Sequence, residues 1–522
     1  MLRGGRRIQR DLVSLISFLS LSFLTSCIAP LTPHNFLVRL GSDKPLEQRL
    51  ESSKELIEKR KKQAYDYTLA EKAAIFEQER DFFKLGEPFT SIREGDLRGR
   101  SKLSGSFSFL SEELLMLSFK YKATLDEGVR KEVSKCLDAF LLADDNFGRK
   151  GQLPKAVFFS KYKLNEFEDG FHKYYLYGKG GKNSEDFIYF MDDAHGNTMP
   201  QHFHALYFLN KFFEDKEVKE KVIELTDRHI NYLLDVGFTV KRLDGNNATY
   251  AGITGEEYFG FAKNSFLSRV TILEIAKHII EGQNNEDVKF KDSLQKINNE
   301  INGLKESGKI QAIEDITPNI ANFSFSSTSG DKRMFFNYFI LADIERERGG
   351  GNYFKELSDK YWIEKRELFN SLFAFLYLGA KPKNAWSFQD RFNLAVSLEY
   401  FKSFPLDRNN SEILNSFFED EDIEINRFPE FYKSGLKPRN KMPLPVYRRG
   451  IRENEFTRNQ HRLNENIGKD GGRFYIPNDF LTAYYTALAN DFIPLEQQEI
   501  DKTKVDSFLE EVKPLFESVM YK

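Results

Sequence analysis

Apolar residues recur close to the helical period along most of the chain after residue 106. The segment after Asp215 shows the pattern most clearly, because one stripe carries Val218, Val222, Leu225, His229 and Leu233. Charged residues occupy the other positions, as expected for an amphipathic helix. The same spacing predicts helices over 199–214, 264–282, 287–304, 333–347, 353–378, 387–403, 411–419, 479–490 and 502–518.

Two further helices are predicted just before these. The first contains Leu114, Leu115, Leu117 and Phe119, and the next is expected to begin at the box formed by Thr124 and Glu127. Residues 47–85 are rich in charge and predict one or two solvated helices. A β-hairpin is expected over 238–253, where two alternating runs flank the turn at Asp244 and Gly245.

Short loops join most of the predicted helices in pairs, which indicates an all-α protein built from helical hairpins. About twelve helices over roughly 420 residues favour one closed ring over several separate bundles. We therefore expect a closed ring of helical hairpins with a small β-hairpin at its rim. In such a ring, loops that precede the inner helices would meet at one cleft.

The composition is that of a folded protein with nearly balanced charge. The 522 residues are 40% hydrophobic and 14% aromatic, which excludes a disordered chain. Lys and Arg number 76 against 79 Asp and Glu, a formal charge of −3 with both signs interspersed, and this balance does not indicate a nucleic-acid partner.

The N-terminus has the order of a secretory signal peptide. Four arginines within the first ten residues precede an apolar stretch over 12–24, which is too short to span a bilayer. Leu24-Thr25-Ser26-Cys27 then resembles a bacterial lipobox, so Cys27 is expected to carry lipid that anchors an exported protein to the cell membrane or the outer membrane. The alternative is cleavage at another small residue, with Cys27 incidental.

These patterns divide the chain into five parts. We expect a signal peptide over 1–26, a flexible tether over 27–46, a helical extension over 47–104, the toroid over 105–495 and a C-terminal helix over 496–522. Cys136 lies on an apolar helical stripe and is expected to be a small buried residue, so the exported domain would hold together without a disulfide.

Several stretches together resemble a group of uncharacterised bacterial lipoproteins with an (α/α)6-toroid domain similar to the six-hairpin glycosidases. They are the helical hairpin over 109–153, Asp192 to Asn197, the rim turn Asp244-Gly245 with Asn264-Ser265, and Gly472-Arg473-Phe474 with Asp479 to Tyr485. The resemblance covers roughly 105–495 and implies a fold more than an activity. A Trp-Gly that usually follows the rim turn is replaced here by Thr249-Tyr250-Ala251-Gly252.

Candidate catalytic groups are those expected in loops before helices. Asp192, Asp193 and His195 lie together and could supply an acid, a base and an orienting partner. An Asp before a helix is also a common N-cap, so a capping role stays open. The remaining acids expected near the cleft are Glu256, Asp390 and Asp479, any of which could complete a hydrolytic pair.

Candidate substrate-binding groups form two clusters. Tyr174, Tyr175 and Tyr177 lie in a glycine-rich basic stretch and could stack on sugar rings, or simply belong to a surface loop. Tyr447, Arg448 and Arg449 could engage an acidic glycan or a phosphate, or pair with nearby glutamates. His202 and His204 are two positions apart on a helix, and we expect no metal site and no cofactor.

Taken together, the sequence predicts an exported lipoprotein whose cleft binds or cleaves a glycan. An enzyme of this kind would be a glycoside hydrolase or would resemble a polysaccharide lyase. The alternative is a surface lipoprotein without catalytic activity that binds a ligand or acts as a scaffold.

Overall fold

The computed structural model describes most of the chain after residue 45. The described residues are 46–83, 94–95, 101–102, 106–159, 188–192, 194, 196, 198–253, 261–282, 288–310, 329–366, 369–407, 445–448, 474–475 and 477–520. They contain 14 α-helices and three small antiparallel sheets, so the protein is mostly helical and the expected all-α class is confirmed.

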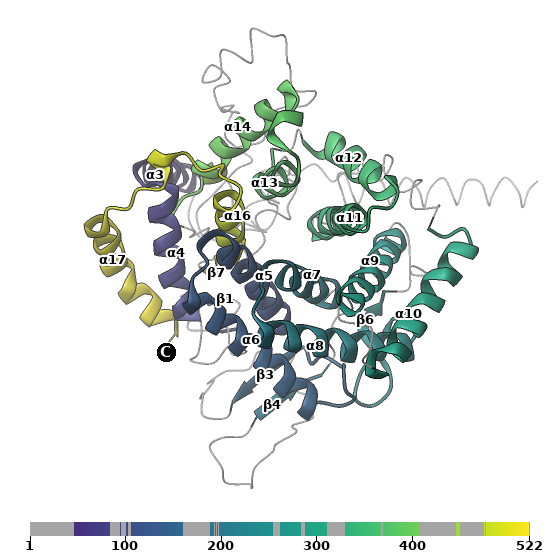
Figure 1. Cartoon of the computed structure of the whole chain (residues 1–522). Coiled ribbons are helices and arrows are strands. Elements are labelled where there is room, and N and C mark those ends of the chain that lie inside the picture. The colour runs from purple at the N-terminus through teal and green to yellow at the C-terminus, as the bar shows by residue number, and fades with distance from the viewer. Residues whose placement is uncertain are drawn as a thin grey trace, which may run out of the picture.

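Six helices pack side by side around the interior of the molecule, and we call them the inner helices (Figure 1). They are α5 (Ser106–Thr124), α7 (Thr198–Phe212), α9 (Phe261–Glu281), α11 (Ser329–Glu347), α13 (Ser371–Ala380) and α16 (Asn478–Leu488). Each packs against the next one along the chain, and α16 packs against α5. The order of packing therefore returns to the helix from which it started.

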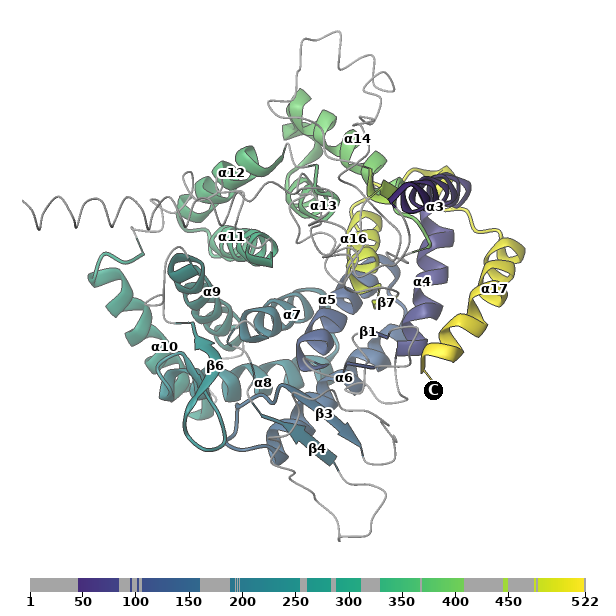
Figure 2. The same ribbon diagram turned by 180° about the vertical axis from the view of Figure 1, so that it is seen from behind.

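A second layer of helices covers the first from outside, as the view from behind also shows (Figure 2). Its members are α6 (Glu127–Asn146), α8 (Lys216–Asp235), α10 (Val288–Glu306), α12 (Tyr353–Lys365) and α14 (Phe388–Lys402). Each packs on the inner helix that precedes it in the chain. Hairpins of one inner and one outer helix thus repeat along the sequence.

The two ends of the described chain meet on the outside of α16. Helix α4 (Leu69–Phe83), which follows α3 (Leu46–Asp66), packs on α16, and α17 (Lys502–Met520) packs on α4. The Thr68 hydroxyl donates a hydrogen bond to the carbonyl of Glu499 at 2.7 Å, and Lys504 pairs with Glu71 at 3.2 Å. Residues more than 400 positions apart therefore stabilise one another.

The two layers differ in the distribution of apolar residues for a physical reason. An inner helix contacts other helices on several sides, so almost every residue of α7 from Thr198 to Leu209 is buried. An outer helix contacts the protein on one side, so α8 buries the stripe that contains Val218, Val222 and Leu225. The stripe predicted for this segment is confirmed, and it begins at the N-cap Asp215.

Two predicted helix boundaries are wrong. The helix expected over 353–378 is two helices, because Phe369 has a φ of +50° and Asn370 caps α13 by accepting a hydrogen bond from the N–H of Phe373. The helix expected to start at the Thr124 box begins at Glu127 instead, with Asp126 as its N-cap. Short polar residues favour such helix-starting geometries. The helix expected over 411–419 lies outside the described residues.

The strands are short and lie at the periphery. Strands β5 (Thr239–Lys241) and β6 (Asn247–Gly252) form the predicted hairpin. Strand β3 (Ala156–Phe159) pairs with β4 (Ile188–Met191), and β1 (Glu94–Gly95) lies between β2 (Ser101–Lys102) and β7 (Phe474–Tyr475). These last two sheets were not predicted, because they join segments distant in the chain and each strand is too short to show a period.

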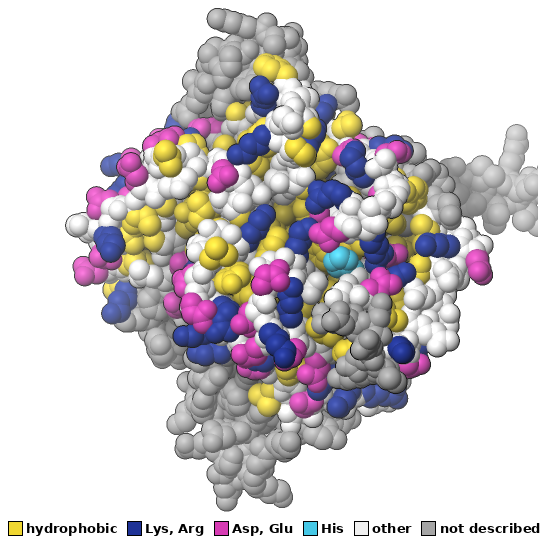
Figure 3. Space-filling model, viewed as in Figure 1, with side chains coloured by type: hydrophobic (Ala, Val, Ile, Leu, Met, Phe, Trp, Pro, Cys, Tyr) yellow, Lys and Arg dark blue, Asp and Glu magenta, His cyan; other side chains and the backbone are white. Residues whose placement is uncertain are grey.

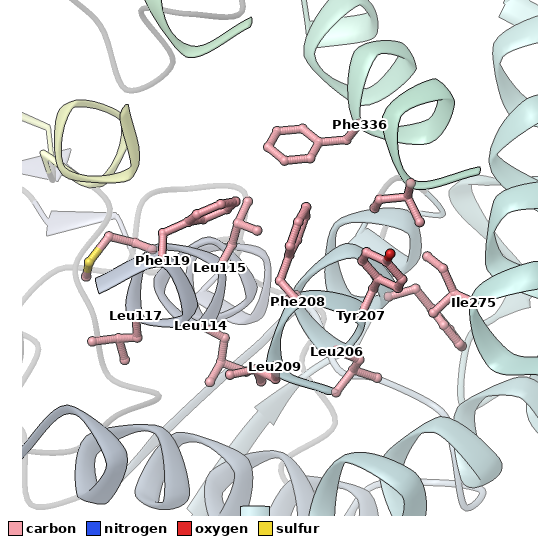
Figure 4. Close-up of a cluster of buried hydrophobic side chains, with 14 of the residues drawn as sticks. Leu114, Leu115, Leu117, Phe119, Leu206, Tyr207, Phe208, Leu209, Ile275 and Phe336 are labelled. Carbon is pink, nitrogen blue, oxygen red and sulfur yellow. The ribbon is translucent and has the colours of Figure 1, made fainter. Parts of the chain in front are cut away.

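Aromatic side chains from several inner helices pack together in the interior. Figure 4 shows Phe119, Phe208 and Phe336 directed from α5, α7 and α11 into a common space. Ring centroids are 4.8 Å apart for Phe119 and Phe208 and 6.1 Å apart for Phe208 and Phe336. Burying each such ring stabilises the fold by about 1.5–3 kcal/mol. Cys136 is buried against the same core, as the sequence predicted.

The backbone of Gly151 lies very close to the backbone of α8. Its φ is +84°, and a Cβ there would lie 2.1 Å from the carbonyl oxygen of Arg228. We expect Gly151→Ala to lower the free energy of unfolding by about 3 kcal/mol or more, since it adds a clash with backbone to the strain of positive φ.

Gly245 supplies a matched control for this prediction. Its φ is +83°, but a Cβ there would meet nothing within 4 Å, so Gly245→Ala should cost about 1–2 kcal/mol from strain alone. Urea denaturation of both variants measures the difference. Equal losses of stability would contradict the predicted clash.

Candidate functional site

Four polar side chains from four inner helices meet near the N-terminal ends of those helices. Lys332 on α11 places its Nζ 2.8 Å from Asp479 Oδ1 on α16 and 3.7 Å from Glu112 Oε1 on α5. Gln201 on α7 donates a hydrogen bond from Nε2 to Glu112 Oε1 at 3.4 Å. We call these four residues the Lys332 cluster.

Helix geometry explains how these residues meet. Lys332, Asp479 and Gln201 lie within the first turn or two of their helices, and Glu112 lies in the second turn of α5. Because α16 packs on α5, and α5 packs on α7, these N-terminal turns are adjacent in space. A carboxylate near a helix N-terminus interacts favourably with the helix dipole, and Asp479 lies in the first turn of α16.

The charged members of the cluster are almost fully buried. The exposed fraction is 8% for Lys332, 7% for Glu112 and 5% for Asp479. Burial by itself lowers the pKa of Lys332, but the charges of Asp479 and Glu112 outweigh it, so the pKa lies well above its ordinary value. One ammonium group therefore stays charged between two carboxylates.

A second buried polar group lies one turn further along α7 and α11. His204 Nε2 lies 2.8 Å from Asn337 Oδ1, and the Asn337 amide donates to the Ser268 hydroxyl on α9 at 3.0 Å. Burial lowers the pKa of His204 to about 4, although its hydrogen bond to Asn337 opposes the shift. This imidazole is neutral at pH 7, and its Nε2 donates to the Asn337 oxygen.

Asn478 adds an unused hydrogen-bonding group beside Asp479. The residue is 2% exposed, and neither its amide nitrogen nor its amide oxygen has a hydrogen-bond partner within the described part of the chain. Buried amides in folded proteins are normally paired. An amide in this state, next to a buried charge cluster, can both donate to and accept from a ligand.

The cluster can both donate and accept hydrogen bonds. Carboxylate oxygens of Glu112 and Asp479 accept hydrogen bonds from hydroxyl groups, whereas Lys332 and the amides donate to hydroxyl or carbonyl oxygens. Such a mixture suits a ligand with many hydroxyls. Both carboxylates share one ammonium group, that of Lys332.

Comparisons of the chain with protein-family models, with curated proteins and with solved structures found no match.

Asp192 is close to a peripheral hairpin. Its Oδ2 accepts a hydrogen bond from the N–H of Leu243 at 2.9 Å and lies 4.0 Å from Arg242 Nε. The carboxylate is buried and holds the turn between β5 and β6. Its partners in the catalytic prediction, Asp193 and His195, lie outside the described residues, as does Glu256.

Asp390 has a capping role at the start of an outer helix. Ser387 and Asp390 form a reciprocal capping box at the N-terminus of α14, and Lys381 Nζ lies 2.7 Å from Asp390 Oδ2. Burial raises the pKa of Asp390, but hydrogen bonds from Lys381 and Ser387 outweigh this and bring it below its ordinary value. Neither Lys381 nor Ser387 belongs to the Lys332 cluster.

The predicted substrate-binding residues are placed only in part. Tyr447 is buried in a small apolar cluster with Ile57 and Ala64. Its ring packs edge-to-face with that of Tyr65, and the ring centroids are 6.2 Å apart. Arg448 ends the short 3₁₀ helix η6 (Val446–Arg448). Arg449 and the three tyrosines Tyr174, Tyr175 and Tyr177 lie outside the described residues.

Of the acids named from sequence that lie in the described residues, which are Asp192, Asp390 and Asp479, it is Asp479 that joins the Lys332 cluster. Glu112, Gln201 and Lys332 were not predicted. A signal for Glu112 existed, because Glu112 and Glu113 interrupt the apolar run from Phe107 to Phe119. A charged pair inside a buried helix requires partners from neighbouring helices.

The C-terminal ends of α7, α9 and α11 carry a second polar network. The Tyr207 hydroxyl donates to Asp343 at 2.6 Å, Lys211 bridges Asp343 and Glu347, and His278 lies 3.3 Å from Glu347. Figure 3 shows a histidine among interspersed acidic and basic side chains on one face. Each of these groups already has an opposite charge or a hydrogen bond, as in a structural network.

No group of three or more His, Cys, Asp or Glu side chains there is arranged to hold a metal ion. Likewise, none of the helices in the described ranges combines the length and apolar content needed to cross a bilayer.

Proposed function

We propose that the two layers of helices form an (α/α)6 toroid of the six-hairpin-glycosidase type, as the sequence resemblance implies. The cyclic order of packing among the inner helices supports this, together with the outer helix that follows most of them. In this arrangement α4 serves as the outer partner of α16, so the N-terminal extension completes the ring.

The function proposed for this ring is the binding of a glycan at the Lys332 cluster. One observation carries the proposal: the ammonium of Lys332 lies between Glu112 and Asp479, three charged groups from helices far apart in the sequence. Buried charges of both signs, with the amides of Gln201 and Asn478, provide the donors and acceptors that sugar hydroxyls need.

Hydrolysis of the glycan is a second candidate, favoured by the same pair of acids. Glycosidases use two carboxyl groups on opposite sides of the bond to be cleaved. Glu112 and Asp479 both contact one Lys332 Nζ, so they lie near enough to act on one sugar linkage. A substrate that drew Lys332 away from one acid would raise the pKa of that acid and make it a proton donor.

Purified protein tests both candidates. We expect envelope polysaccharides to bind, and Asp479→Asn and Glu112→Gln each to weaken binding by about tenfold or more, since each removes a charged hydrogen-bond acceptor. Release of reducing ends that disappears in both variants would establish hydrolysis. Binding without release would leave recognition as the function.

Glu113→Gln is the matched control, because Glu113 is a buried acid on the same helix that pairs with Arg80 at 3.2 Å. It should bind the polysaccharide as the wild type does. Wild-type affinity in both cluster variants would refute the site.

The localisation that we propose is the cell envelope, with lipid on Cys27 as the membrane anchor. The signal-like N-terminus and its lipobox support it, and both lie outside the described residues. Labelled palmitate should enter the wild-type protein and be absent from Cys27→Ala expressed in a bacterial host. Labelling of the variant would contradict the assignment. A protein that is labelled but binds no glycan would favour the scaffold alternative.

A further inference from the structure

A polar cavity of about 580 Å³ lies at the periphery, apart from the Lys332 cluster. It is bounded by the last residues of α6 and α8, the turn after α6 and the β5–β6 hairpin. Its charged lining consists of Asp145, Arg149, Asp235, Lys241 and Arg242. A volume of this size suits a small ligand such as one or two sugar units.

Two of the three basic side chains are available to a ligand. The third, Arg242, is already paired with Asp244 at 3.2 Å. In the described ranges, Lys241 contacts the Asn247 amide oxygen at 2.5 Å and has no acidic partner, and Arg149 has neither a hydrogen bond from its guanidinium nor an ion pair. A planar guanidinium without a partner, exposed at a cavity, can take a carboxylate through two parallel hydrogen bonds.

Of the two acidic lining residues, one likewise has a charged partner and the other has none in the described residues. Asp145 is paired with Arg228 at 2.8 Å. Asp235, at the end of α8, has no ion pair or hydrogen bond in the described residues, so its oxygens can accept from hydroxyl groups.

The walls of the cavity are held in place before any ligand arrives. Gln152 donates from Nε2 to the Lys241 carbonyl at 2.7 Å, and its Oε1 accepts from the Arg149 N–H at 3.3 Å. Asp192 stabilises the turn between β5 and β6 by accepting a hydrogen bond from the N–H of Leu243. A bound group would therefore meet a preformed site, which lowers the entropic cost of binding.

We propose that this cavity binds an acidic sugar, with the carboxylate on Arg149 and Lys241 and hydroxyl groups on Asp235. The unpaired charges of both signs carry this assignment, since a simple anion would leave Asp235 unused and a neutral sugar would leave Arg149 unused. Asp192 acts as a positioning residue for Arg242 and the hairpin. The inference stands without the Lys332 cluster.

Calorimetric titration of the full chain with D-glucuronate tests the proposal, with D-glucose and acetate as the neutral and anionic comparisons. We expect glucuronate to bind about tenfold or more tightly than either comparison. Arg149→Gln should weaken glucuronate binding by about tenfold or more, because it removes a bidentate charged contact. Asp235→Asn should weaken it less and leave acetate binding unchanged.

Lys150→Gln provides the control, since Lys150 is exposed, adjacent to Arg149 and outside the cavity lining. It should bind glucuronate within twofold of the wild type. Equal binding by Arg149→Gln and the wild type would overturn the proposal, as would acetate binding as tightly as glucuronate or the absence of glucuronate binding at millimolar concentration. None of these variants alters the Lys332 cluster, so polysaccharide binding there is a separate readout.

Discussion

Lys332→Met is expected to lower the free energy of unfolding at pH 7 by about 3–5 kcal/mol, because it leaves Glu112 and Asp479 as buried charges without their common ammonium. The side chain is similar in length, so the effect comes mainly from charge. Chemical denaturation at a fixed pH measures it.

The pH dependence of the variant distinguishes this cause from lost packing. Two neighbouring carboxylates without a cation have raised pKa values, so the folded variant takes up a proton more readily than the unfolded chain. Lowering the pH from 7 towards 5 should therefore recover part of the lost stability. A loss that is independent of pH would show that packing, and not charge, is responsible.

Lys355→Met is the matched control for an ion pair. Lys355 pairs with Asp359 at 3.0 Å on α12, but the side chain is 62% exposed and the pair is screened by water. Its removal should change stability by about 0.5 kcal/mol or less. Similar effects in Lys332→Met and Lys355→Met would refute the energetic role of burial in the cluster.

Acidification is expected to destabilise the protein through histidines buried in neutral form. His202 on α7 and His229 on α8 are fully buried, their ring centroids are 4.7 Å apart, and none of their four ring nitrogens has a hydrogen-bond partner in the described residues. Burial lowers the pKa of His229 to about 4 and that of His202 well below its ordinary value.

The direction follows from proton uptake. The unfolded chain binds protons near pH 6.5, whereas folded His229 binds them near pH 4, so stability is lost as the pH falls between these values. From pH 7 to pH 5, His229 alone should account for about 2 kcal/mol. His204, whose pKa is also lowered to about 4, acts in the same direction.

His229→Phe tests this assignment, because it removes the titrating ring and keeps an aromatic side chain in the core. Unfolding free energies measured at pH 7 and pH 5 should differ by about 2 kcal/mol less in the variant than in the wild type. The comparison uses the change with pH, so any packing cost of the phenyl ring cancels. An unchanged pH dependence would show that the folded wild type already accepts the proton.

Local pattern was enough to predict much of the fold. The stripe on α8 and the β5–β6 hairpin followed from period and turn residues, because each depends on neighbours in the chain. The division between α12 and α13 was missed although Asn370 is a good N-cap residue, since an apolar period continues across it. Asp390 was read as a candidate acid, whereas the Ser387 and Asp390 spacing matches a capping box.

The candidate sites were less accessible to sequence reasoning. Asp479 could be named as an acid near the start of a helix, and it does join the Lys332 cluster. Its partners Glu112 and Lys332 come from helices more than 100 residues away, and periodicity reports which face of a helix is buried but not which helix covers that face. Tyr447 illustrates the converse, since a ring expected to bind a ligand packs in an apolar cluster.

Local sequence patterns account for the helical class of this protein, the positions of most helices and the β5–β6 hairpin, since those depend on interactions over a few residues. The folded chain was needed to show that α16 packs against α5, that one lysine lies between two acids, and that Arg149 and Asp235 border one cavity. Burial and charge compensation depend on side chains brought together across hundreds of residues, and no local pattern contains that information.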